Sequence, residues 1–117
     1  MDREELKRRT KKFALDIIHL VEEFPRSKTG DIIGRQLIKS ATSVGANYRA
    51  ACRAQSHAHF ISKISIVEEE ADESLYWLEL SKDADLADEK KISPFIKEAN
   101  ELTAIFVSSK KTAREKK

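Results

Sequence analysis

The sequence of 117 residues is poor in the residues that interrupt helices or build disulfides. It contains three glycines, two prolines and a single cysteine, Cys52. One cysteine excludes an intramolecular disulfide and a cysteine-based metal site, and it gives no sign of an oxidising compartment. No apolar run approaches the roughly 20 residues that span a bilayer, and the highly charged N-terminus is unlike a signal peptide. We therefore expect a soluble, cytoplasmic protein.

The residues that are abundant favour helices. Charged residues make up 36% of the chain and hydrophobic residues 40%, with alanine, leucine, isoleucine, glutamate and lysine prominent. The length fits one domain with one core. The composition therefore predicts a single all-α domain over residues 1–117.

Four stretches with helical apolar spacing predict helices at about residues 2–24, 29–55, 57–82 and 88–113. Pro25 is expected to end the first helix, and Thr29, Ser56 and Asp88 to cap the next three. Pro94 lies too deep for an ideal first-turn proline and predicts a kinked or ragged start. Short breaks between long helices imply antiparallel neighbours, so we expect an up-down-up-down four-helix bundle.

The predicted core is the apolar face of each helix. Its members are Leu6, Phe13, Ile17, Leu20, Phe24, Ile33, Leu37, Ala41, Val44, Tyr48, Ala51, Phe60, Ile64, Val67, Ala71, Leu75, Leu78, Ile92, Phe95, Ala99, Leu102 and Phe106. Gly45 costs about 1 kcal/mol of helix propensity relative to alanine, so its presence suggests a close approach of another backbone.

Basic residues gather on the opposite face of the second helix. Arg35, Lys39, Arg49 and Arg53 all fall within about 40° of the direction of Arg35 at 100° per residue, and we call these four residues the basic stripe. Two interpretations stay open. The stripe is a solvated face whose cations pair with acids such as the run from Glu68 to Glu73, or it contacts the phosphates of a nucleic acid.

Charge is also segregated along the chain. Residues 1–55 carry 12 basic and 7 acidic side chains (+5), residues 56–104 carry 5 and 12 (−7), and residues 105–117 carry 5 and 1 (+4). This asymmetry suggests a polyanionic partner, self-association, or both. The N-terminal cluster of Lys7, Arg8, Arg9, Lys11 and Lys12 contains no aromatic residue or base-reading motif, so we favour a solubilising helix face over the alternative of a nucleic-acid contact.

Nothing in the sequence predicts catalysis or a cofactor. The histidines His19, His57 and His59 lack the i, i+4 spacing and the further ligands of a helical zinc site. There is no glycine-rich phosphate loop, nucleophile elbow or Cys/His pair arranged for covalent chemistry. We therefore expect a protein that is not an enzyme and that has no catalytic residue, metal site or cofactor.

Two adjacent aromatic residues suggest an interface between subunits. Tyr76 and Trp77 cannot both face the core, because Leu75 and Leu78 define the inward face and neighbours diverge by 100°. At least one must point sideways. It either packs at the periphery with its polar tip at solvent or lies at a subunit interface, where tryptophan and tyrosine are enriched, and we favour the interface. Further apolar residues beside each core face agree with oligomerisation.

The segment "GRQLIKSATSVGANYRAACRAQS" (Gly34 to Ser56) resembles the signature of a bacterial family, the 23S rRNA intervening sequence proteins. Gln36, Ser43, Val44, Asn47 and Tyr48 carry the distinctive part of the pattern. The resemblance continues through "FISKISIVEEEADESLYWLEL" and "EANELTAIF", and covers most of the chain from about residue 13 to residue 111. Some relatives have a Glu-Gly pair where this chain has Ala51 and Cys52.

This resemblance implies an up-down bundle that assembles into a ring-shaped homopentamer without catalytic activity. A distant branch resembles the accessory protein of diversity-generating retroelements, a basic pentamer that binds nucleic acid and a reverse transcriptase. Two hypotheses result. In the first, the protein is a non-enzymatic oligomer that binds RNA or DNA through phosphate contacts from the basic stripe. In the second, it is a structural or adaptor ring that binds a protein partner or itself, without nucleic acid.

Overall fold

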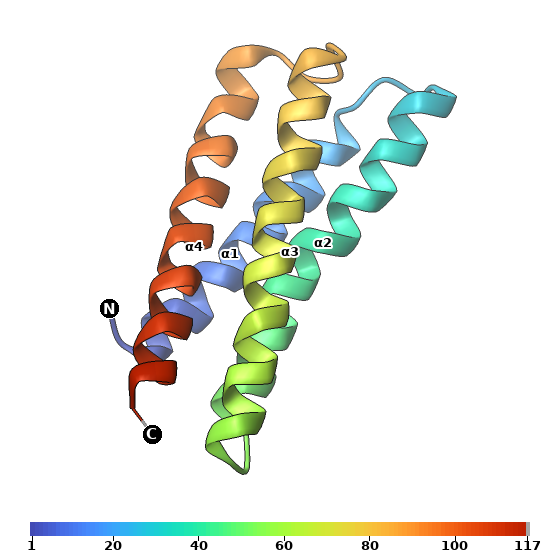
Figure 1. Cartoon of the computed structure of the whole chain (residues 1–117). Coiled ribbons are helices and arrows are strands. Elements are labelled where there is room, and N and C mark those ends of the chain that lie inside the picture. Colours follow the sequence, from blue (N-terminus) through green and yellow to red (C-terminus); the bar gives the residue numbers. More distant parts are fainter. Residues whose placement is uncertain (117) are drawn as a thin grey trace.

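The computed structural model describes residues 1–116. It contains four helices: α1 (Arg3–Glu22), α2 (Lys28–Cys52), α3 (His57–Asp83) and α4 (Glu89–Glu115). Figure 1 shows successive helices running in opposite directions, with both ends of the chain at the same end of the molecule. The bundle measures 48 × 21 × 20 Å. The expected all-α antiparallel four-helix bundle is confirmed.

Helix α1 is the least enclosed member of the bundle. The helices α2 and α3 pack together most extensively, followed by α3 with α4 and α1 with α2, whereas α1 and α4 make the slightest of these contacts. In Figure 1, α1 crosses obliquely behind the upright α3 and α4. The position of α1 is therefore set mainly by α2.

The predicted apolar faces meet in one core, as expected. The fully buried large apolar side chains are Phe13, Ile17, Leu37, Val44, Ile64, Val67, Leu78, Ile92, Leu102 and Phe106. Phe60, Leu75 and Phe95 are partly buried and pack against the edge of this core. Every helix contributes to the core, so the face that each helix turns to solvent is fixed.

The caps at the helix starts agree with the sequence at two of three positions. Ser27 caps α2, where its Oγ accepts a hydrogen bond from the Gly30 backbone at 3.0 Å, so the prediction of Thr29 as the cap was wrong. Ser27 has the extended backbone of an N-cap, whereas Thr29 already lies inside the helix. Ser56 caps α3 as predicted. Asp88 holds the N-cap position of α4, although its side chain makes no capping hydrogen bond.

Pro94 lies inside α4, which is helical from Glu89 onward, so a ragged start is not observed. The proline removes the N–H that would reach the Lys90 carbonyl. Pro94 and Lys90 are both exposed, so water can solvate that carbonyl. Ser93 Oγ donates to the Glu89 carbonyl at 2.7 Å. The start of α4 therefore tolerates the proline.

Helix α1 approaches α2 at Gly45, where the sequence suggested it, and more tightly at Gly34. A Cβ atom on Gly34 would lie 2.7 Å from Val21 Cγ1, which is closer than side chains pack. A Cβ atom on Gly45 would lie 3.4 Å from Thr10 Oγ1 and 3.5 Å from the Thr10 carbonyl carbon, an ordinary contact. Only Gly34 is required by the packing of the two helices.

We expect Gly34→Ala to lower the free energy of unfolding by about 1–3 kcal/mol, because Val21 is β-branched and cannot easily leave its rotamer. Gly45→Ala is the matched control. It should raise the free energy of unfolding by up to about 1 kcal/mol, because alanine has the higher helix propensity. Urea denaturation of both variants measures the difference. A Gly34→Ala variant as stable as Gly45→Ala would contradict the assignment of the close contact.

Candidate nucleic-acid interface

The four residues of the basic stripe all lie on the outside of the bundle. Arg35, Lys39 and Arg49 are exposed on α2, and Arg53 is exposed at its C-cap. The helix rises about 27 Å between Arg35 and Arg53, at 1.5 Å per residue. No ion pair formed within residues 1–116 involves any of these four side chains. The stripe is thus a solvent-facing row of cations.

A groove of about 380 Å³ runs between α1 and α2 beside this stripe. Small side chains leave the space, and long cationic side chains from both helices line it. The lining residues are Lys7, Arg8, Lys11, Ala14, Thr42, Gly45, Ala46 and Arg49. We call this hollow the basic groove. It joins part of the N-terminal cluster to one residue of the stripe, Arg49.

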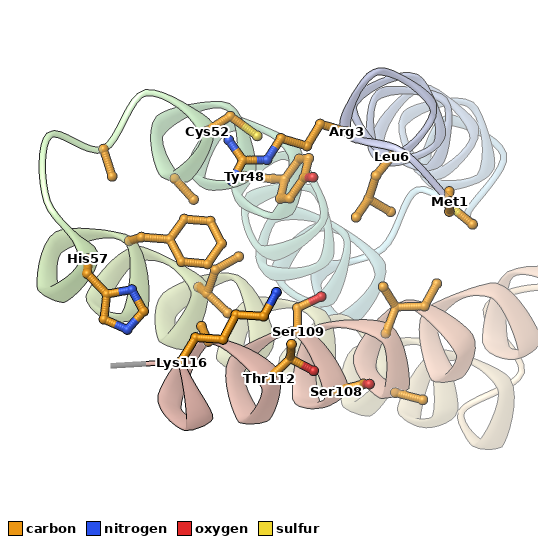
Figure 2. Close-up of a pocket in the computed structure, with 17 residues that line it drawn as sticks. Met1, Arg3, Leu6, Tyr48, Cys52, His57, Ser108, Ser109, Thr112 and Lys116 are labelled. Atoms are coloured by element: carbon orange, nitrogen blue, oxygen red, sulfur yellow. The ribbon is translucent and has the colours of Figure 1, made fainter.

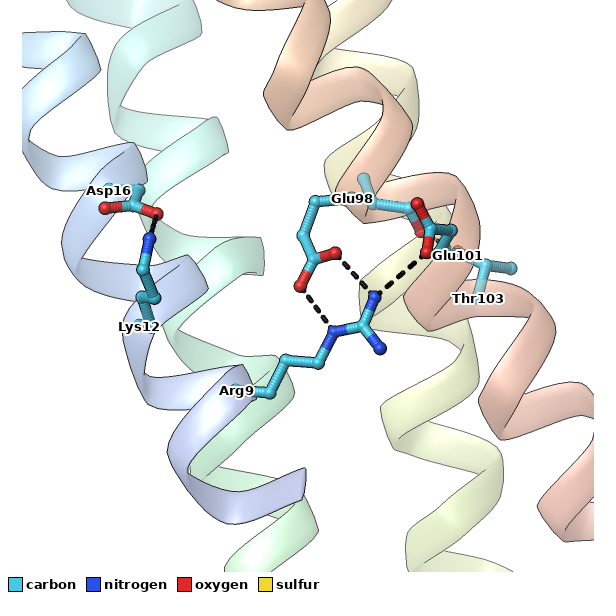
Figure 3. A network of polar contacts seen from close by, with 7 residues as sticks. Arg9, Lys12, Asp16, Glu98, Glu101 and Thr103 are labelled. Carbon is cyan, nitrogen blue, oxygen red and sulfur yellow. Dashed lines mark hydrogen bonds and ion pairs between the residues drawn. The ribbon is translucent and has the colours of Figure 1, made fainter. Parts of the chain in front are cut away.

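Other members of the N-terminal cluster are paired with acids. Arg9 reaches α4, where its Nε and Nη2 atoms donate to Glu98 at 2.7 and 2.6 Å, and Nη2 also lies 3.2 Å from Glu101 (Figure 3). The hydrogen bonds with Glu98 are the main cause of a raised Arg9 pKa. Lys12 pairs with Asp16 at 2.7 Å on the same helix.

The remaining three cations of the cluster line the basic groove. Lys7 also pairs with Glu4 at 3.2 Å, whereas Arg8 and Lys11 form no ion pair within the described part of the chain. The cluster is therefore divided between ion pairs and the wall of the basic groove, and its role as a solubilising face stays a prediction. Because α1 and α2 are antiparallel, residues near position 8 lie close to residues near position 49. This pairing of the two predicted helices could have revealed the basic groove from the sequence.

The acidic run on α3 lies beside the stripe but does not neutralise it. Glu68 lies 3.9 Å from Lys110 of α4. Burial, together with a hydrogen bond to Glu73, raises the pKa of the Glu70 carboxyl, and a hydrogen bond with Ser43 and the nearby Lys39 charge partly oppose this rise. Lys39 is thus close enough to affect Glu70, yet no ion pair joins them in the described residues. The second hypothesis expects the stripe to pair with Glu68–Glu73 within or between subunits, and no such pair forms within residues 1–116 of one chain.

Tyr76 and Trp77 lie on the outer side of α3. Tyr76 is 56% exposed, whereas Trp77 is half-buried against the edge of the core. Their rings meet edge to face with centroids 5.1 Å apart, and Trp77 Nε1 donates to Glu73 at 3.2 Å. The expectation that one of the two points sideways is confirmed for Tyr76.

The described residues offer no arrangement for metal chemistry or membrane crossing. Within residues 1–116, no three His, Cys, Asp or Glu side chains converge on a position where a metal ion would fit. No helix in that part of the chain has an apolar stretch long enough to cross a bilayer.

We expect Glu70→Gln to stabilise the fold at neutral pH. The folded chain holds the Glu70 proton more tightly than the unfolded chain, so the free energy of unfolding falls as pH rises from about 4.3 through the raised pKa. The glutamine variant lacks this loss. The free energy of unfolding of Glu70→Gln should exceed that of the unmodified protein at pH 7, and the difference should vanish at about pH 3. Urea denaturation at the two pH values measures it. The exposed neighbour variant Glu69→Gln serves as control, and an equal gain in both would contradict the role of Glu70.

The chain is similar over nearly its whole length to a protein of known structure. The known structure is the crystal structure of a protein of unknown function from the S23 ribosomal protein family of Bacteroides thetaiotaomicron VPI-5482. The two share 31% sequence identity with a TM-score of 0.86, and the match covers 95% of this chain and 99% of the other. No curated protein matches the chain.

The family model of the 23S rRNA-intervening sequence proteins matches residues 4–108. This range contains α1, α2 and α3 almost completely and most of α4. The sequence resemblance noted at Gly34–Ser56 lies inside it. The chain belongs to the 23S rRNA-intervening sequence protein family.

Proposed function

We propose that the protein is a non-enzymatic, cytoplasmic nucleic-acid-binding protein whose basic stripe contacts backbone phosphates. The observation that carries this proposal is the exposure of Arg35, Lys39, Arg49 and Arg53 on one helix face, without ion-pair partners in residues 1–116. Such cations release condensed counterions when they meet phosphates, and that release drives binding.

The basic groove extends the proposed footprint onto α1. Arg8 and Lys11 lie across the groove from Arg49, so a phosphate strand that follows the stripe would meet cations from two helices. The groove holds no aromatic residue on which a base would stack. Contacts limited to phosphates position a nucleic acid without reading its sequence. We therefore expect binding to RNA and DNA with little base specificity. The names of the family and of the solved relative refer to ribosomal components, which supports RNA as one ligand.

We further propose that the chain assembles into a homo-oligomer, with Tyr76 and Trp77 at the interface. The exposure of the Tyr76 ring supports this assignment, since aromatic side chains are preferred anchors between subunits. The family resemblance suggests a pentameric ring. In a symmetric oligomer the stripe is repeated, and several weakly binding stripes together would bind one nucleic acid more tightly.

The second candidate function is an adaptor ring that binds a protein partner or its own copies and no nucleic acid. The acidic outer face of α3, next to the exposed Tyr76, favours this alternative. In that case the stripe would be neutralised by the Glu68–Glu73 run of another subunit. The first candidate predicts that a polyanion binds to the stripe, and the second predicts that it does not.

We expect the double variant Arg35→Glu and Arg53→Glu to weaken binding to unrelated RNA and DNA duplexes by at least tenfold at low salt, because two phosphate contacts become repulsive. Fluorescence anisotropy with labelled duplexes measures the affinities. A second double variant, Arg8→Glu and Lys11→Glu, tests the α1 side of the basic groove in the same assay.

The control is Lys90→Glu with Lys97→Glu. Both lysines are exposed on α4, whose backbone makes no close contact with that of α2 in residues 1–116, and the change in net charge is the same. Binding should fall much less than in the stripe variant. Equal losses would mean that net charge alone matters, and unchanged binding in the stripe variant would remove the stripe from the site.

We expect Trp77→Ala to lower the mass of the oligomer while the single chain stays folded, because the Trp77 ring is only half-buried in the bundle. Light scattering measures the mass, and circular dichroism checks the fold. Leu75→Ala, also half-buried on α3, is the matched truncation. A folded Trp77→Ala variant of unchanged mass would exclude this residue from the interface.

A further inference from the structure

A second, larger hollow lies at the end of the bundle where α1 and α3 begin and α2 and α4 end. Its volume is about 1000 Å³, at the upper end of the range typical of small-molecule sites. Small side chains leave this space open, among them Ala51, Ala54, Ala104, Ser109 and Ala113. The slight contact between α1 and α4 adds to the opening. We call this hollow the end cavity.

Cationic side chains reach the end cavity from opposite sides. Figure 2 shows Arg3 of α1 above Tyr48, and the Lys116 ammonium directed inward from the end of α4. His57 lies at the rim. No Asp or Glu is among the described residues that line the cavity, and the neighbouring Asp2 carboxylate caps α1 by accepting from the Glu5 backbone. The field inside the cavity therefore favours a negative charge.

Three hydroxyl groups on α4 face the same space without internal partners. Ser108, Ser109 and Thr112 line the cavity, and they form no hydrogen bond among those found within residues 1–116. On the same helix, Ser93 and Thr103 instead donate to carbonyls of the preceding turn at 2.7 and 2.8 Å. The three hydroxyls in the cavity are therefore available to donate to a ligand.

The remaining wall is apolar. Leu6 and Ile64 are buried, and Phe60 is partly buried. The Arg3 guanidinium carbon lies over the Phe60 ring, 5.5 Å from the centroid of that ring. The Tyr48 ring contacts the Phe106 ring at a tilt of 48°, with centroids 5.5 Å apart. Burial, together with a hydrogen bond to Cys52, raises the pKa of the Tyr48 phenol. Tyr48 therefore stays neutral and adds no negative charge to the wall.

We propose that the end cavity binds a small organic anion with an apolar body. The anionic group lies between Arg3 and Lys116 and accepts hydrogen bonds from the hydroxyls of α4. The apolar body lies against Leu6, Phe60 and Ile64. This site is separate from the basic stripe, so the proposal is independent of nucleic-acid binding.

The test uses 1-anilinonaphthalene-8-sulfonate, a fluorescent aromatic sulfonate of this chemistry, on the full chain. We expect saturable binding with one site per chain and a rise in the thermal midpoint with probe concentration, which a loosely folded chain would not show. N-phenyl-1-naphthylamine, the same molecule without the sulfonate, should bind at least tenfold more weakly. Unsaturable binding, or equal affinity for both probes, would overturn the proposal.

Variants then locate the site. Arg3→Gln with Lys116→Gln should weaken binding of the sulfonate at least tenfold. Lys90→Gln with Lys97→Gln removes the same charge from exposed positions outside the cavity and should leave sulfonate binding unchanged. Equal affinity of both double variants would overturn the assignment of the anion site.

A filled cavity provides an independent check. Ala104 is an exposed residue of the cavity wall, so Ala104→Trp should fill the space without disturbing the core and should abolish binding. Ala84→Trp, at an exposed C-cap position outside the cavity, is the control. Sulfonate binding that survives in a folded Ala104→Trp variant would place the probe elsewhere.

Discussion

The burial of one apolar face per helix in a shared core determines the rest of this structure. Side chains such as Phe13, Leu37, Ile64 and Phe106 lose all contact with solvent, and each buried side chain of this size contributes about 1.5–3 kcal/mol. A rotation of α2 that hid the basic stripe would expose this face and bury unpaired arginines, which is strongly unfavourable. The outward direction of the stripe therefore results from the core.

The position of α1 creates both of the hollows discussed above. Gly34 lets α1 lie close to α2, while the slighter contact with α4 includes the hydrogen bonds from Arg9 to Glu98 and Glu101. Where α1 passes the small residues of α2, it leaves the basic groove. Where α1 begins, away from α4, it leaves the end cavity. Packing of one helix thus shapes two different chemical surfaces.

The sequence predicted the helices and the core well, because these depend on local composition and on apolar spacing. It failed where the outcome depends on contacts between helices. Gly45 and Gly34 look alike in sequence, but only the neighbour on α1 determines which of them must lack a side chain. Likewise, Arg9 and Arg8 are adjacent, yet one pairs with α4 and the other lines the basic groove. The end cavity involves all four helices and had no signal in any single segment.

The measurement that tests the central claim most directly is the salt dependence of binding of the unmodified protein to an RNA hairpin and a DNA duplex. If all four stripe residues of a chain meet phosphates, the logarithm of the binding constant should fall on DNA with a slope of about −3.6 against the logarithm of salt concentration. An oligomer that engages several stripes would give a steeper slope. Absence of binding at about 50 mM salt, or a slope near zero, would contradict a phosphate-contacting function.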